Sequence, residues 1–79
     1  MNRTFFIKHD NRDWQEYTGP FSYGRLDAIK DYTRDHLPGW TTTGPGHHVE
    51  SRDGHALYAA DVINPDQTIG ARIWIRQPY

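Results

Sequence analysis

Two turn signals in the last third of the chain constrain its fold more strongly than any other feature. Asp53-Gly54 favours a two-residue hairpin turn, because glycine adopts positive φ angles without strain. Pro65, in the stretch "NPDQ", supplies the φ of about −65° that a second turn requires. The two turns predict a three-stranded antiparallel meander with strands at about His47–Ser51, His55–Ile63 and Thr68–Arg76.

The residues of these strands alternate between apolar and polar types in step with the two turns. A turn at Asp53-Gly54 places Val49 opposite Tyr58, and a turn at Pro65-Asp66 places Tyr58 opposite Ile73. Because successive side chains of a strand point to opposite faces, the apolar residues then share one face. This predicted core face contains Val49, Ala56, Tyr58, Ala60, Val62, Ile69, Ala71, Ile73 and Ile75.

One amphipathic helix is predicted at about Tyr23–Leu37, where Leu26 and Ile29 begin a pattern of apolar residues at three- and four-residue steps. Ser22 is expected to cap its first turn through the side-chain hydroxyl. Pro38-Gly39 should end it, since proline cannot continue a helix. The residues expected to be buried between helix and sheet are Leu26, Ile29, Tyr58, Val62, Ile73 and Ile75.

The segment before the helix predicts a β-hairpin with strands at about residues 3–9 and 13–18. The turn-forming stretch "DNRD" separates the strands, and a three-residue loop would set Ile7 opposite Tyr17. Residues 38–47 include two prolines and three glycines, so they are expected to lack regular structure. The fold class that follows is α+β: an antiparallel sheet of four or five strands with the helix packed on one face.

The composition argues against several functional classes. With 79 residues, the chain is expected to form one small domain. It has no cysteine, which excludes disulfides and thiolate zinc sites and suits a reducing cytoplasm. No apolar run approaches the ~18 residues of a membrane span. Nine Lys and Arg residues stand against ten Asp and Glu residues, whereas a protein dedicated to phosphate backbones normally has a clear basic excess.

The histidine-rich stretch "GPGHHVESRDGH" is not expected to bind a metal. His47 and His48 are neighbours on a strand, so their side chains point to opposite faces. His48 and His55 share the face opposite to the core face (the second face), but the predicted register separates them by roughly 13 Å, too far to bind one ion together. No catalytic motif is present, and so small a chain has little room for a pocket of about 300 Å³. We therefore predict no metal, no cofactor and no enzymatic activity.

The second face carries the residues that best fit an interface. Arg72 and Arg76 flank Trp74 along one strand, and the predicted register puts Leu57 opposite Trp74 and His55 opposite Arg76. An exposed Trp beside Arg and Leu has the composition of an interaction hot spot. The predicted partner interface comprises Arg52, His55, Leu57, Arg72, Trp74 and Arg76.

Several alternatives stay open at this point. Phe6 or Trp14 of the N-terminal segment would cover Trp74 if that segment folded over the second face. A protein partner is favoured over single-stranded nucleic acid, because Glu50 and Asp61 near the same surface oppose phosphates. A homodimer is a further possibility, alongside a monomer. The second interface candidate is the acidic side of the helix, with Asp27, Asp31 and Asp35.

The chain also resembles a class of small inhibitor proteins in size and in the order of its elements. The segments "SYGRLDAIKDYTRDHLPG" and "ALYAADVINPDQTIGARIWIRQ" carry this resemblance over about half of the chain. The plan is similar to that of several anti-CRISPR proteins of phages and mobile elements, although it includes no diagnostic motif. The resemblance implies a non-enzymatic inhibitor in the cytoplasm of a bacterial host. Such a protein would bind a subunit of a CRISPR-Cas complex and block access to its target nucleic acid.

Overall fold

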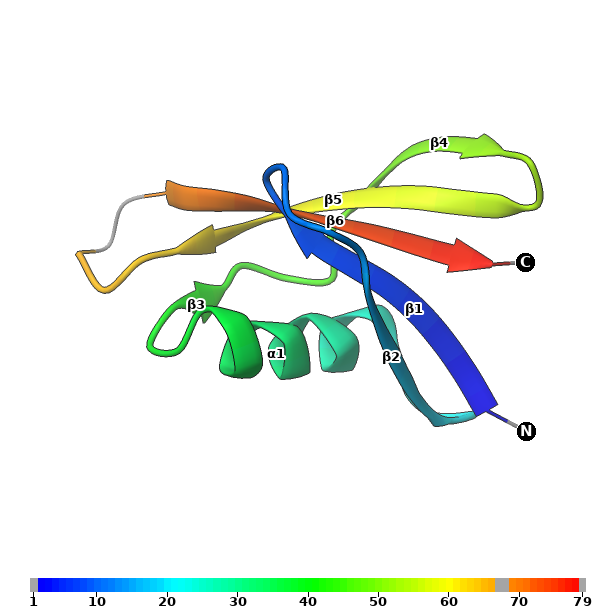
Figure 1. Cartoon of the computed structure of the whole chain (residues 1–79), viewed down its shortest axis with the longest axis horizontal. Helices are drawn as coiled ribbons and strands as arrows, with labels where there is room; N and C mark the ends of the chain where they lie inside the picture. Colours follow the sequence, from blue (N-terminus) through cyan, green and yellow to red (C-terminus); the bar gives the residue numbers. More distant parts are fainter. Residues whose placement is uncertain (1, 67–68, 79) are drawn as a thin grey trace.

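The computed structural model describes residues 2–66 and 69–78, with the backbone alone for Ile69, and places one helix against a curled antiparallel sheet (Figure 1). The elements in chain order are β1 (Asn2–His9), β2 (Gln15–Pro20), α1 (Arg25–His36), β3 (Thr41–Thr42), β4 (His47–Arg52), β5 (His55–Ile63) and β6 (Ile69–Pro78). The predicted α+β fold is confirmed. In Figure 1 the helix lies below the sheet, and the β4–β5 hairpin extends beyond the end of the helix.

The N-terminal and C-terminal strands are neighbours in the sheet. The strand order is β2-β1-β6-β5-β3, and β4 also pairs with β5. β3 pairs with one end of β5 and β4 with the other end. These two strands are therefore parts of one edge strand that is interrupted at residues 43–46. The prediction that residues 38–47 lack regular structure is wrong for Thr41–Thr42.

Two hairpins have registers that differ from the predicted ones by two residues. In β1–β2, Ile7 lies opposite Gln15 and not opposite Tyr17. In β5–β6, Tyr58 lies opposite Ile75, two residues beyond its predicted partner. Because side chains alternate with a period of two, a slip of this size leaves Tyr58 and Ile75 on their predicted face. A further shift of one residue between Val62 and Ile63 places Ile63 opposite Ile69, so the predicted pairing of Val62 with Ile69 is wrong.

A β-bulge in β4 changes the face of the residues before it. Glu50 lies opposite Leu57 as predicted, but the register shifts by one residue between His48 and Glu50. His48 therefore lies opposite Tyr58, on the helix side of the sheet, instead of on the second face. Val49 was predicted to be in the core, yet 45% of its surface is exposed.

The core lies between α1 and the face of the sheet that the helix covers. Four of the predicted core residues are fully buried, whereas Leu26 and Tyr58 are only half-buried. Phe5 and Ile7 of β1 are also fully buried, which places this strand at the centre of the packing. The residues that form the buried cluster are Phe5, Ile7, Ala28, Ile29, Tyr32, Ala60, Val62, Ala71, Ile73 and Ile75.

Hydrogen bonds from backbone N–H groups close both ends of the helix. Gly24, and not Ser22, caps the first turn, and its N–H donates to Oδ2 of Asp27 at 3.0 Å. At the other end the Leu37 N–H donates to the Thr33 carbonyl at 2.8 Å. Pro38 follows at once and cannot continue the helix.

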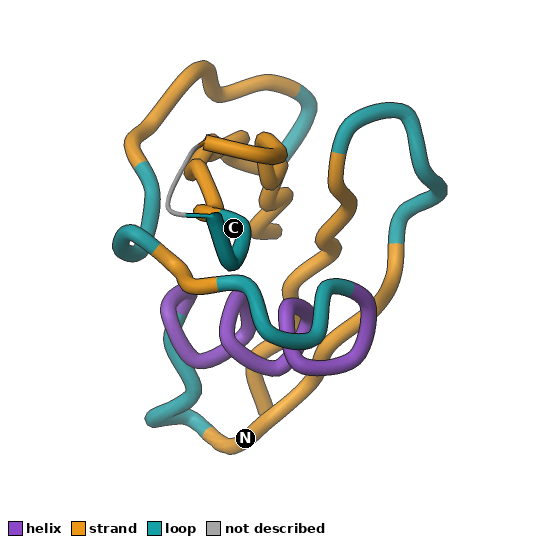
Figure 2. Tube along the Cα trace, turned by 90° about the vertical axis from the view of Figure 1, so that its left-hand side faces the viewer, coloured by secondary structure: helices purple, strands orange, loops and turns teal. Residues whose placement is uncertain are grey.

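The sheet curls so that its second face stays free of the helix. In the end-on view of Figure 2, α1 lies in the lower half, while the β1–β2 turn rises at the upper right and the β4–β5 hairpin rises at the top. No helix of the described chain covers this side. The predicted interface residues on the second face are therefore not covered by α1.

Candidate binding surface

The register of the sheet brings charged and aromatic side chains from different strands together on the second face. In one row across the sheet, Phe6 of β1 lies opposite Arg76 of β6, which in turn lies opposite Leu57 of β5. In the next row, Lys8 of β1 lies opposite Trp74 of β6. Each row thus sets an aromatic ring beside a cation.

Two predicted pairings on this face are wrong, because the β5–β6 register is shifted by two residues. Leu57 lies opposite Arg76 instead of Trp74, and His55 lies opposite Pro78 instead of Arg76. The shift keeps all of these side chains on the second face, so the predicted interface residues still share one surface.

Trp14, from the β1–β2 turn, has two cations within cation–π distance of its ring. Its ring centre is 4.9 Å from Nζ of Lys8 and 5.3 Å from Cζ of Arg76. The same guanidinium carbon is 5.7 Å from the ring centre of Phe6. Such contacts stabilise exposed sites by about 0.5–1 kcal/mol each. They hold the four side chains in one cluster, which we call the Trp14 cluster (Phe6, Lys8, Trp14 and Arg76).

The predicted interface does not include three members of the Trp14 cluster. Alternation along β1 was the available signal for two of them: Phe5 and Ile7 are buried under the helix, so Phe6 and Lys8 must point to the second face. Trp14 lies in a turn, where alternation predicts no direction.

Trp74 is half-buried, which falls between the two predicted alternatives for this residue. Cζ of Arg72 lies 5.9 Å from its ring centre, and Lys8 faces it from the neighbouring strand. Nε of Arg72 also donates to Oδ1 of Asp61 at 3.4 Å, which fixes the guanidinium beside the ring. Part of the indole remains accessible to a partner.

A cleft of about 230 Å³ opens on the second face beside Trp14. It lies between the β1–β2 turn and β4, the two parts that rise away from α1 in Figure 2. Four predicted interface residues line it, whereas Arg72 and Trp74 do not. The lining residues are Trp14, Glu50, Arg52, His55, Leu57 and Arg76.

The cations of this surface differ in whether a carboxylate balances them. Arg52 pairs with Glu50 at 3.7 Å, and Arg72 has the carboxylate described above. In contrast, no carboxylate within residues 2–66 and 69–78 lies at ion-pair distance from Lys8 or Arg76. The Trp14 cluster therefore carries two positive charges that the described part of the chain does not neutralise.

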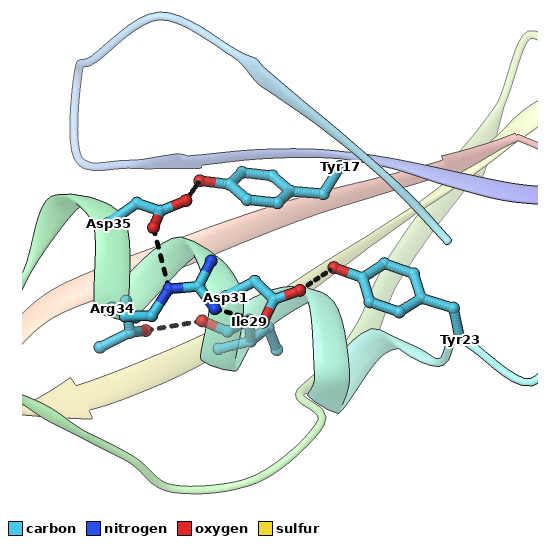
Figure 3. A network of polar contacts seen from close by, with 7 residues as sticks. Tyr17, Tyr23, Ile29, Asp31, Arg34 and Asp35 are labelled. Carbon is cyan, nitrogen blue, oxygen red and sulfur yellow. Dashed lines mark hydrogen bonds and ion pairs between the residues drawn. The ribbon is translucent and has the colours of Figure 1, made fainter. Parts of the chain in front are cut away.

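The acidic residues of α1, the second interface candidate, all bond to groups of the protein itself (Figure 3). The Tyr23 hydroxyl donates to Asp31 at 2.7 Å, and the Tyr17 hydroxyl donates to Asp35 at 2.9 Å. Asp27 accepts the backbone N–H that begins the helix. These carboxylates tie α1 to β2 and to the turn after it, and their role as an interface stays a prediction.

Two other clefts are larger than the sequence led us to expect. One, of about 330 Å³, has polar lining residues that include His9, Tyr32 and His36. The other, of about 440 Å³, lies between the end of α1 and β3 and is lined in part by Leu37 and Trp40. Neither shares a lining residue with the cleft beside Trp14.

The sheet separates His48 from the other two histidines of the predicted loop and hairpin. His47 and His48 point to opposite faces as predicted, but the bulge exchanges their faces, so that His47 lies with His55 on the second face. Within the described residues, no group of three His, Asp or Glu side chains is placed to hold a metal ion.

Comparisons with protein-family models, with curated proteins and with solved structures found no match. The twelve-residue α1, the one helix in residues 2–66 and 69–78, falls short of the length and apolar character that crossing a membrane demands.

Proposed function

We propose that this protein is a non-enzymatic module that binds another protein through its second face. One observation carries the proposal: Trp14 and Trp74 are only half-buried and stand beside Arg72, Arg76 and Lys8 on a face that α1 leaves uncovered. Trp and Arg are the residues most enriched in the energetic centres of protein interfaces. Rings held by cations are also pre-ordered, which lowers the entropy lost on binding.

The charges of the surface favour a protein partner over a nucleic acid. Glu50 and Asp61 lie on the second face and engage Arg52 and Arg72. A nucleic acid would bring its phosphates next to these carboxylates, which costs free energy. The chain as a whole has a formal net charge of −1, so it lacks the basic excess that drives binding to phosphate backbones.

The architectural resemblance to anti-CRISPR proteins suggests the kind of partner. It implies a subunit of a CRISPR-Cas complex in the cytoplasm of a bacterium, with inhibition through blocked access to the target nucleic acid. An inhibitor of this kind needs a stable interface and no catalytic group. A rigid sheet face with a central aromatic cluster meets that requirement.

The test is capture of the partner from the cytoplasm of a bacterium that contains a CRISPR-Cas complex, followed by mass spectrometry. Trp74→Ala should weaken capture of a specific protein by roughly thirtyfold, the equivalent of ~2 kcal/mol at an interface hot spot. Lys30→Ala removes an exposed side chain from α1, on the other side of the molecule, and should leave capture unchanged.

Three further measurements decide between the alternatives. Thermal melting must show that Trp74→Ala is folded, and Arg72→Ala provides a second variant with a smaller change in packing. Unchanged capture by both variants would move the interface to Asp27, Asp31 and Asp35. A gel shift with single-stranded DNA or RNA that weakens steeply with salt would identify a nucleic-acid partner instead.

A further inference from the structure

The Trp14 cluster and its neighbouring cleft differ from the rest of the second face in charge and shape. We propose that they form a receptor for one carboxylate side chain that stands beside an apolar side chain on the partner protein. This inference rests on the proposed function and specifies the chemistry of its partner. Lys8 and Arg76 would bind the carboxylate, and the cleft would take the apolar group.

The charge argument depends on the contrast among the cations of this face. Arg52 and Arg72 each have a carboxylate within the chain, whereas the described residues provide none for Lys8 or Arg76. Two like charges held near the same Trp14 ring repel each other, and an incoming anion relieves that repulsion. Hydrogen bonds from such cations to a carboxylate are shorter and stronger than those between neutral groups.

The aromatic rings make this anion site more ordered than two free surface cations. Arg76 lies near both the Phe6 and Trp14 rings, so its guanidinium is held in place before a ligand arrives. A planar guanidinium can donate two parallel N–H bonds to the two oxygens of a carboxylate. Because the side chain is already ordered, less conformational entropy is lost when those bonds form.

The shape of the cleft indicates what accompanies the carboxylate. Its volume of about 230 Å³ is below the ~300–1,000 Å³ of sites for whole small molecules. Leu57 and the Trp14 ring give it apolar lining, and Arg76 belongs to both the cleft and the Trp14 cluster. An aromatic or aliphatic side chain next to an Asp or Glu in sequence fits this combination. Glu50, which also lines the cleft, disfavours the more highly charged phosphate group.

The experiment uses the full chain, labelled with ¹⁵N, and two capped dipeptides, Phe-Glu and Phe-Gln. The NMR signals to follow are the indole N–H of Trp14 and the Nε–H of Arg76. We expect Phe-Glu to shift both signals saturably at millimolar concentrations and to bind about tenfold more tightly than Phe-Gln, a difference of ~1.4 kcal/mol. Arg76→Gln should abolish that tenfold preference, and Lys30→Gln, which removes a cation from α1, should retain it.

Two results would overturn the inference: equal binding of the two dipeptides, or no shift of the Trp14 indole by either. A thymidine oligonucleotide that shifts the same signals at lower concentration would also overturn it. If Arg76→Gln does not fold, Arg76→Lys keeps the charge without the planar fork and should retain only part of the preference.

Partner capture separates this inference from the function on which it rests. If Trp74→Ala loses the partner while Lys8→Gln and Arg76→Gln keep it, the protein-binding face stands and the carboxylate receptor is wrong. If none of the three variants loses the partner, the proposed function itself is wrong.

Discussion

The hydroxyl of Tyr32 lies 2.6 Å from Nδ1 of His9 and also accepts the His9 backbone N–H at 3.1 Å. Tyr32 is only 1% exposed, so its proton needs an acceptor within the protein, and Nδ1 of a neutral imidazole provides it. Burial lowers the pKa of His9. The charges of Arg12 and His36 lower this pKa further, whereas the charge of Asp10 raises it. His36 also packs on the Tyr32 ring, with ring centres 4.5 Å apart.

This contact predicts that the protein loses stability in mild acid. Because the folded-state pKa of His9 lies below its ordinary value of 6.5, the unfolded chain binds more protons between the two values. The contribution of His9 is therefore complete above pH 6.5 and is lost as the pH falls through the folded-state pKa. Melting temperatures measured from neutral pH downward should decline, with a shallower slope in His9→Gln. Equal slopes in the two proteins would contradict this prediction.

Ile73 and Val49 are both branched apolar residues, but we expect them to contribute very differently to the free energy of unfolding, because the bulge in β4 leaves Val49 exposed. Ile73 is fully buried, whereas Val49 is 45% exposed. Ile73→Ala should lower the free energy of unfolding by about 2–5 kcal/mol, because it removes buried methyl groups and leaves a cavity. Val49→Ala should change it by less than ~0.5 kcal/mol. Chemical denaturation measures both, and a large loss for Val49→Ala would restore the register without the bulge.

The hydrogen bond from Tyr23 to Asp31 connects the turn that follows β2 to the helix. We therefore expect the stability effects of these two residues to be coupled. Removing either partner by Tyr23→Phe or Asp31→Ala should destabilise the protein, and the double variant should lose less than the sum of the two. A coupling of about 1 kcal/mol is expected for a hydrogen bond to a partly buried carboxylate. Denaturation of the three variants and the parent gives this value. Additive losses would show that the hydroxyl and the carboxylate act independently.

Any side chain larger than that of glycine at position 70 is expected to clash with Trp40. A Cβ atom at this position would overlap the ring of Trp40. Gly70→Ala should therefore cost about 1–3 kcal/mol of stability, the range for overpacked sites. Combining it with Trp40→Leu, which shortens the opposing side chain, should recover part of that loss. A fully additive double variant would mean that the ring moves aside freely.

The parts of the fold that could be predicted are those that follow from alternation and turn chemistry. Asp53 and Gly54 both adopt positive φ, at 52° and 84°, as a two-residue hairpin turn requires. Alternation then assigned the faces of residues 56–62 and 71–76 correctly, although their register slipped by two residues, because a period of two does not distinguish such slips. The bulge at Val49 is a slip of one, which no alternation pattern reports.

The candidate surface was predictable to the same extent. Arg72, Trp74 and Arg76 were placed on the correct face by alternation within a single strand. The Trp14 cluster was not foreseen, because it depends on β1 lying beside β6 and on a turn residue reaching over β1. Both are long-range relationships, which local periodicity does not encode.

The pairing of β1 with β6 has a consequence for the order of events during synthesis. Phe6 lies opposite Arg76, so β1 leaves the ribosome well before β6 and must wait for it before its inner edge is paired. Until then Phe5 and Ile7, which are buried in the finished domain, remain open to solvent and to chaperones. Contacts of such long sequence separation also slow folding, because a large loop must close before they form. A ribosome that pauses before β6 would therefore hold a nascent chain in which the buried side chains of β1 are still unprotected.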